Sequence, residues 1–200
     1  MGVEPVVEAL LAGLPALLPT DTVYGLCAKA DRADAVLAAY RLKGRPESDP
    51  SALLCGDVET LLALVPELRG EPERLLRGLL PGPYTFVLPN PARRYAWLGG
   101  SRPEAIGVRV PVLPAATRGV LDRVGGVMAT SANHPGEADP RRLADVPGDI
   151  RDGCGAELDG GELPGIPSTV VDLTAPEPRV LRDGAVSAAE ALERIRSLTA

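Results

Sequence analysis

Several residue types are scarce in this sequence, and each shortage narrows the range of functions. The 200 residues include three cysteines and one histidine, and aromatic residues make up 3%. Cys27, Cys55 and Cys154 form no Cys-x-x-Cys pair and His134 stands alone, so we expect no zinc site. No apolar run is long enough to cross a membrane, and the acidic N-terminal residues are unlike a signal peptide. Cysteines that are few, scattered and odd in number indicate reduced thiols, and reduced thiols indicate a cytoplasmic protein.

Common catalytic and nucleotide-binding signatures are also missing. The sequence has no GxxxxGK[ST] phosphate-binding loop, no GxGxxG after a strand, and no nucleophile elbow whose serine would pair with His134. The net charge is −6 and the isoelectric point is near 4.9. This acidity disfavours nucleic-acid binding by bulk charge but leaves room for a local basic cleft.

The remaining composition predicts a globular α/β protein. Hydrophobic residues make up 45%, enough for a sizeable core, and the length indicates one domain over residues 1–200. Helical and strand patterns interleave without repeats, which predicts a twisted mixed parallel/antiparallel sheet flanked by helices. The predicted helices are 3–14, 33–42, 58–64, 72–80, 115–124, 141–145 and 188–197. The predicted strands are 15–19, 52–55, 84–88, 106–110, 127–129, 169–173 and 179–182.

The stretch 19–26 combines an apolar approach with hydroxyls and a carboxylate. The pattern predicts a buried strand whose carboxyl end opens, before a break at Gly25, into a loop of ligand-binding groups. Thr22 can donate and accept hydrogen bonds, whereas ionised Asp21 only accepts. The alternative interpretation is a polar turn that caps a helix.

Basic and hydroxyl side chains occur where other predicted strands and loops meet. They are Lys43, Arg45, Arg109, Ser131, Asn133, Ser168 and Arg182. If these junctions point to one side, four cations and several hydroxyls line one cavity, which suits a ligand with several phosphates. For each arginine alone the alternative is a solvated surface charge, and for Asn133 it is a turn residue. Lysine and asparagine each occur only twice, which weakens the explanation of Lys43 and Asn133 as surface filler.

Seven motifs, in order, resemble the Sua5/YciO/YrdC family. They are PTDTVYGL at 19–26, KGRP at 43–46, PGPYT at 81–85, GVRVP at 107–111, TSAN at 130–133, STVVD at 168–172 and LRDG at 181–184. The resemblance implies a YrdC-like fold and a nucleotidyltransferase that makes threonylcarbamoyl-AMP and pyrophosphate from L-threonine, bicarbonate and ATP. In this family a separate transferase moves the threonylcarbamoyl group to adenosine 37 of tRNA.

The resemblance also implies roles for residues that match the motifs. The implied catalytic residues, at the phosphates and the carbamate, are Lys43 and Arg45. The implied threonine and carbamate ligands are Thr22, Arg109 and Ser168. The implied ATP ligands are Arg45, Ser131, Asn133 and Arg182. Mg²⁺ is implied as an ion held mainly by ATP, with no metal site made of protein side chains.

Two positions depart from the family pattern. Asp49 stands where many relatives have asparagine and would repel phosphate unless it pairs with Arg45 or a metal. Leu54 stands where long relatives often carry histidine. The sequence also stops soon after the last motif, so it resembles the short form of the family.

Three other functions stay open at this point. One is a carbamoyl-adenylate module like that of hydrogenase maturation proteins, which would not need threonine. Another is an RNA- or ribosome-binding protein of the same fold that uses the basic cleft without catalysis, although the net charge of −6 argues against it. Separately, Arg93 and Arg94 beside Tyr95 and Trp97 form a mix that can stack on bases. The alternative for that loop is a flexible surface segment. The last is a relative with altered activity, because of Asp49.

Overall fold

The computed structural model describes residues 2–199 and, for Thr199, the backbone alone. The strands are β1 (Ala16–Pro19), β2 (Tyr24–Lys29), β3 (Ala52–Leu54), β4 (Tyr84–Pro89), β5 (Ala105–Arg109), β6 (Val127–Ser131), β7 (Ala156–Glu157), β8 (Thr169–Asp172) and β9 (Arg179–Arg182). The helices are α1 (Val3–Ala12), α2 (Ala33–Lys43), α3 (Val58–Leu64), α4 (Glu71–Leu79), α5 (Ala115–Val124), α6 (Gly148–Asp152) and α7 (Ala188–Thr199). Three short 3-10 turns are η1 (Pro66–Leu68), η2 (Ala96–Leu98) and η3 (Leu143–Asp145).

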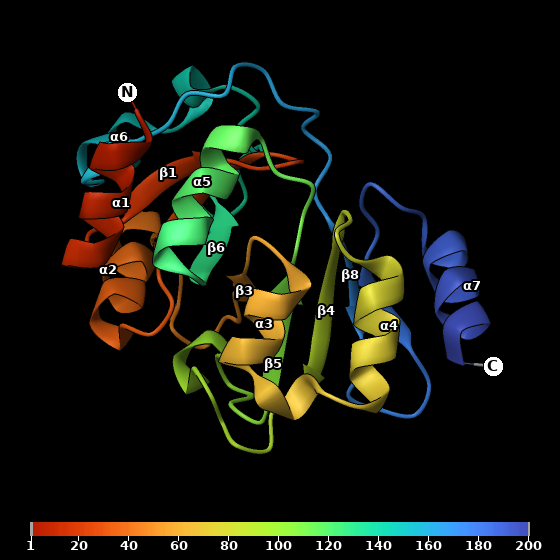
Figure 1. The fold of residues 1–200 in the computed structure, drawn as a ribbon. Coiled ribbons are helices and arrows are strands. Elements are labelled where there is room, and N and C mark those ends of the chain that lie inside the picture. The colour runs from red at the N-terminus through yellow and green to blue at the C-terminus, as the bar shows by residue number, and fades with distance from the viewer. Residues whose placement is uncertain (1, 200) are drawn as a thin grey trace.

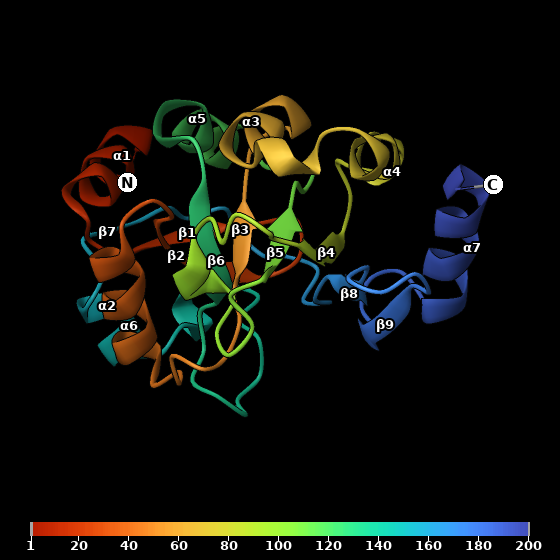
Figure 2. The same cartoon turned by 90° about the horizontal axis from the view of Figure 1, so that it is seen from below.

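The nine strands of the described residues join one mixed sheet, which confirms the predicted α/β fold. Their order is β7-β1-β2-β6-β3-β5-β4-β8-β9, with parallel and antiparallel pairs (Figure 1, and Figure 2 for the labels of the remaining strands). Figure 2 shows α1, α5, α3 and α4 in a row on one side of the strands, with α2 and α6 on the other and α7 beyond β9. Among the described residues, no helix has the length and apolar character needed to span a membrane.

The structure confirms one part of the interpretation of stretch 19–26 and corrects another. Gly25 does not break the pattern but lies inside β2, a strand that the sequence did not predict. The polar residues before it form a turn between antiparallel β1 and β2, where Pro19 pairs with Tyr24. The expected buried strand is present as β1, and its carboxyl end opens, as expected, into a turn of polar residues. The helix-cap alternative is wrong, because the chain reverses after four intervening residues and re-enters the sheet at Tyr24.

At the centre of the sheet, the pairing register places large hydrophobic side chains on one face and small side chains on the other. Leu53 lies opposite Val108 and Met128, and all three are fully buried in the main core. One residue earlier, Ala52 lies opposite Gly107 and Ala129. Because side chains alternate along a strand, this second set projects to the other face, where it leaves room above the sheet.

Candidate functional site

A cavity of about 270 Å³ opens over the small residues of the sheet. Its floor includes Gly25, Ala52, Gly107 and Ala129, whose short side chains allow a ligand to come close to the backbone. The cations that line it are Arg45, Arg102, Arg109 and Arg182, whereas Asp139 is the acid that lines it. Asp21 pairs with Arg109 and Asp172 pairs with Arg102, so Arg45 and Arg182 are the arginines that keep this part of an otherwise acidic protein positive.

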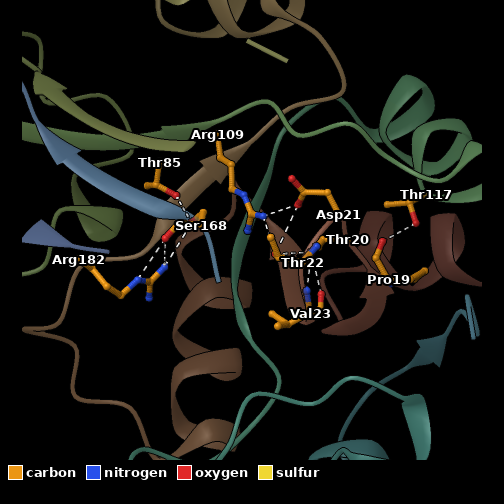
Figure 3. A network of polar contacts seen from close by, with 10 residues as sticks. All are labelled: Pro19, Thr20, Asp21, Thr22, Val23, Thr85, Arg109, Thr117, Ser168 and Arg182. Carbon is orange, nitrogen blue, oxygen red and sulfur yellow. Dashed lines mark hydrogen bonds and ion pairs between the residues drawn. The ribbon is translucent and has the colours of Figure 1, made fainter. Parts of the chain in front are cut away.

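The β1–β2 turn is rigid because its own hydroxyls hold it. Thr20 Oγ1 accepts from the backbone N–H of Thr22 and Val23, at 3.2 and 3.3 Å, and donates to the Val23 oxygen at 2.7 Å. Thr117 of α5 donates to the Pro19 oxygen at 2.8 Å and ties the turn to a helix (Figure 3). These contacts fix Thr22 where it can meet a ligand.

Arg109 reaches this turn from the end of β5. Its Nη2 atom donates to Asp21 Oδ1 and, at 2.7 Å, to Thr22 Oγ1 (Figure 3). The side chains of Arg109 and Asp21 are each 11% exposed. Burial raises the pKa of Asp21 and lowers the pKa of Arg109, and the attraction between the two charges opposes both shifts. The Arg109 Nε atom is buried without a partner, which leaves a donor for a ligand.

Arg182 and a pair of hydroxyls form a second polar cluster. Arg182 Nη2 donates to the Ser168 backbone oxygen at 2.9 Å and lies 3.3 Å from Ser168 Oγ. The hydroxyls of Ser168 and Thr85 share a hydrogen bond of 2.8 Å (Figure 3). No carboxylate among residues 2–199 lies within ion-pair distance of Arg182, so its charge is open to an anion.

Arg45 extends from the loop after α2. Its Nη2 atom donates to the Pro50 oxygen at 2.6 Å, and its Nε atom is buried without a partner. In the described part of the chain it forms no ion pair, and Asp49 does not line the cavity. The repulsion expected between Asp49 and phosphate stays a prediction, because Asp49 directly precedes Pro50, which lines the cavity. Leu54 also lies away from the cavity, buried beneath α5.

Lys43 is the one predicted cation that lies behind the cavity wall. It is the last residue of α2 rather than part of a loop, and it is 3% exposed. Its Nζ atom donates to the backbone oxygens of Ser131 and Asn133, at 2.7 and 2.5 Å, and to Asn133 Oδ1 at 3.0 Å. Lys43 thus holds the loop after β6, and its catalytic role stays a prediction.

The predicted residues therefore divide into a lining set and a supporting set. Those that line the cavity are Thr22, Arg45, Arg109, Ser131, Ser168 and Arg182. Lys43 and Asn133 support them, because the Asn133 amide is used by Lys43 and by the Glu137 oxygen, at 2.7 Å from Nδ2. Their proposed contacts with ligand stay predictions.

Arg102 is the lining cation that the sequence did not reveal. It follows Ser101 in a loop without a motif, and it donates to Asp172 at 3.2 Å and to Thr174 at 3.0 Å. Only the folded chain brings this loop to the cavity.

The aromatic rings that could have stacked on bases, Tyr95 and Trp97, are packed instead. Trp97 donates to the Ala30 oxygen at 3.0 Å, and the Tyr95 ring meets the Trp97 ring edge to face.

Four arginines around one cavity of a mixed α/β fold are typical of a protein whose ligand is a small, multiply charged anion. A family model for Sua5/YciO/YrdC proteins, described as "Telomere recombination", matches residues 8–184. The chain belongs to this family.

Similar proteins include solved and curated members of the family. The structure of Pyrococcus abyssi Sua5 complexed with L-threonine has a TM-score of 0.87 at 31% identity, covering 96% of this chain and 57% of that one. A Mycobacterium tuberculosis protein is 34% identical over 93% of this chain and 85% of its own length. The human threonylcarbamoyl-AMP synthase is 34% identical over 85% of this chain and 62% of its own length. The chain thus spans little more than half of the Pyrococcus protein.

Proposed function

We propose that this chain is a threonylcarbamoyl-AMP synthase, which consumes L-threonine, bicarbonate and ATP and releases pyrophosphate. One observation carries the proposal: Arg45 and Arg182 line a single cavity without a carboxylate partner among the described residues. Guanidinium groups that line one cavity and have no ion-pair partner match a substrate with several phosphates. The names of the relatives, and the threonine bound to the Pyrococcus protein, supply the particular reaction.

The reaction suits a site made of donors rather than nucleophiles. The threonine amine attacks the carbonyl carbon of bicarbonate, and water leaves to give a carbamate. A carbamate oxygen then attacks the α-phosphorus of ATP, and the bond to pyrophosphate breaks. Both steps bring anions together, so the protein contributes mainly position and neutralising charge.

The geometry supports a division of the cavity between the two substrates. Arg109, fixed by Asp21 and Thr22, offers its free Nε donor to the threonine carboxylate. The Ser168 and Thr85 hydroxyl pair lies between this region and Arg182 and suits the carbamate. Arg45, Arg182 and Ser131 are left for the nucleotide.

Magnesium fits this site as an ion that arrives with ATP. No group of three His, Cys, Asp or Glu side chains among the described residues could hold a metal, and Asp139 is the carboxylate at the cavity. Bound magnesium would neutralise phosphate charge. We also propose that the product passes to a separate transferase that acts on tRNA, as in the family.

Kinetics with one arginine variant tests the substrate assignment. Arg109→Lys keeps the charge but loses the planar fork, so we expect the KM for threonine to rise about tenfold or more while the KM for ATP changes little. Arg69→Lys, at an exposed surface arginine, is the matched control. Pyrophosphate release should require bicarbonate and threonine; equal release without threonine would favour the carbamoyl-adenylate alternative and contradict the proposal.

A further inference from the structure

Two contacts in opposite directions fasten the end of α2 to the loop after β6. The Lys43 ammonium donates to oxygens of Ser131 and Asn133, as described above. In return, the Nδ1 atom of His134 lies 3.1 Å from the backbone oxygen of Lys43. The first segment leads into Arg45 and the second carries Ser131, and both of these residues line the cavity. The paired contacts therefore set the distance between two walls of the site.

The second ring nitrogen of His134 also faces an acceptor. Nε2 lies 3.1 and 3.2 Å from the two carboxylate oxygens of Asp149, in α6. A neutral imidazole has one N–H, so it can donate either to the Lys43 oxygen or to Asp149. The imidazolium has two N–H groups and satisfies both acceptors at once. Protonation of His134 thus completes a bridge from α2, through the loop, to α6.

The charged groups around His134 come from three elements. Asp149 of α6 and Glu137 of the same loop favour the cation, and Glu137 also accepts from the His134 backbone N–H at 3.3 Å. Lys43 of α2 opposes it, although three oxygens surround the Lys43 ammonium. Hydrogen bonding to the Lys43 oxygen and then to Asp149 raises the pKa of His134 above its ordinary value of 6.5.

We propose that His134 is a positioning residue whose protonated form locks the Lys43–Arg45 segment against the Ser131–Asn133 loop, and so holds the nucleotide side of the cavity in its binding geometry. This inference rests on the proposed function, because it concerns the affinity for ATP. Without the second N–H the loop keeps its contacts with the Lys43 ammonium but loses either the bond to the Lys43 oxygen or the bond to α6, so Ser131 and Arg45 separate more easily. Nucleotide therefore binds the imidazolium form more tightly, and binding in turn favours protonation.

One titration reports directly on this bridge, because the chain has a single histidine. NMR follows the ring signals of His134 with pH, in the free protein and with a non-hydrolysable ATP analogue, while calorimetry gives the Kd of the analogue at each pH. We expect the analogue to raise the pKa of His134. The Kd should weaken as pH rises through that range, by about tenfold for each unit of pKa difference between free and bound protein.

Two substitutions on α6 separate this role from a merely structural one. Asp149→Asn removes the charge that favours the imidazolium, so the midpoint of both pH profiles should move to lower pH. Asp152→Asn is the matched control, because Asp152 lies on the same helix but the His134 ring nitrogens face Asp149 and the Lys43 oxygen instead, and it should leave the midpoint in place. Thermal melts of both variants check that the fold is retained.

The possible failures of this experiment have different meanings. If the analogue binds with a Kd that does not depend on the titration of His134, or if Asp149→Asn leaves the midpoint unchanged, the inference is wrong and the proposed function stands. If the analogue does not bind at any pH, the proposed function fails and this inference fails with it.

Discussion

At the scale of single residues, the cations around the cavity have different tasks. Arg45 and Arg182 have no ion-pair partner among the described residues, so their charge can act on a ligand. The Lys43 ammonium instead donates hydrogen bonds to three oxygens of the protein. A compact ammonium with three N–H groups matches three oxygens at 2.5 to 3.0 Å, and a wide, flat guanidinium does not. This geometry explains the retention of a lysine in a chain that otherwise relies on arginine.

Lys43→Arg should lower turnover about tenfold, or near 1.4 kcal/mol of transition-state stabilisation, although the charge is kept. The wider guanidinium of the substituted arginine does not fit among the oxygens of Ser131 and Asn133 and therefore displaces the loop that carries them. Steady-state pyrophosphate release measures the effect, and a thermal melt of the same sample checks folding. Turnover at the wild-type rate would show that charge alone suffices.

The pKa of Lys43 predicts that affinity for an ATP analogue falls at alkaline pH. Burial, and then the charge of Arg45, lowers the pKa of Lys43 to about 8. Above that pH the neutral amine has two N–H donors for three oxygens, so affinity for an ATP analogue should fall between about pH 7 and about pH 9. Lys43→Arg stays charged over this range, so it should bind more weakly and lose this alkaline fall, keeping only the fall that comes from His134.

Residue patterns predicted most of the residues at the site, but not which of them line the cavity and which lie behind its wall. Thr22, Arg109, Ser168 and Arg182 line the cavity as expected, because each lies next to a strand end or turn that the sequence marks. The sequence could not place Lys43 behind the wall, since that depends on where the helix end meets the loop after β6. Arg102 had no local signal at all.

At the scale of elements, Gly184 sets the position of Ser168. A Cβ at Gly184 would lie 2.3 Å from the Pro167 oxygen and 2.5 Å from the Ser168 carbonyl carbon. Both are backbone atoms, so they cannot yield as the tip of a flexible side chain does. The close approach of the segment after β9 to the start of β8 therefore requires glycine.

Gly184→Ala should push Ser168 out of place and lower kcat/KM for threonine by about tenfold or more, because small misplacements of binding groups cost rate. Gly119→Ala in α5 is the matched control, since its Cβ would meet nothing within 4 Å. That control should keep full activity and gain about 0.5–1 kcal/mol of stability. If both alanine variants are equally active, the packing between β9 and β8 does not position the site.

Element prediction succeeded where the local pattern was strong. Helix α5 has the predicted bounds, and Asp57 caps α3 by accepting from Thr60 N at 2.6 Å. Strand β2 was missed because its glycine suggested a break, whereas burial on both faces favours small residues there. Strand β7 has two residues and exists only through its pairing with β1, which no local pattern indicates.

At the scale of the whole molecule, one sheet gathers groups that are far apart in the sequence. The strands that line the cavity belong to segments from the β1–β2 turn to β9, so nearly the whole matched family region contributes to it. The net charge is −6, yet the cavity lining carries four arginines and one acid. Charge separation of this kind attracts a small polyanion while the rest of the surface stays acidic.

The measurement that tests the central claim most directly is mass spectrometry of the reaction product. The full chain is incubated with ATP, magnesium, L-threonine and bicarbonate labelled with heavy carbon. The account predicts threonylcarbamoyl-AMP that carries the label, formed together with pyrophosphate and absent when threonine or bicarbonate is omitted. AMP and pyrophosphate without the labelled adenylate, or no threonine-dependent product at all, would contradict it.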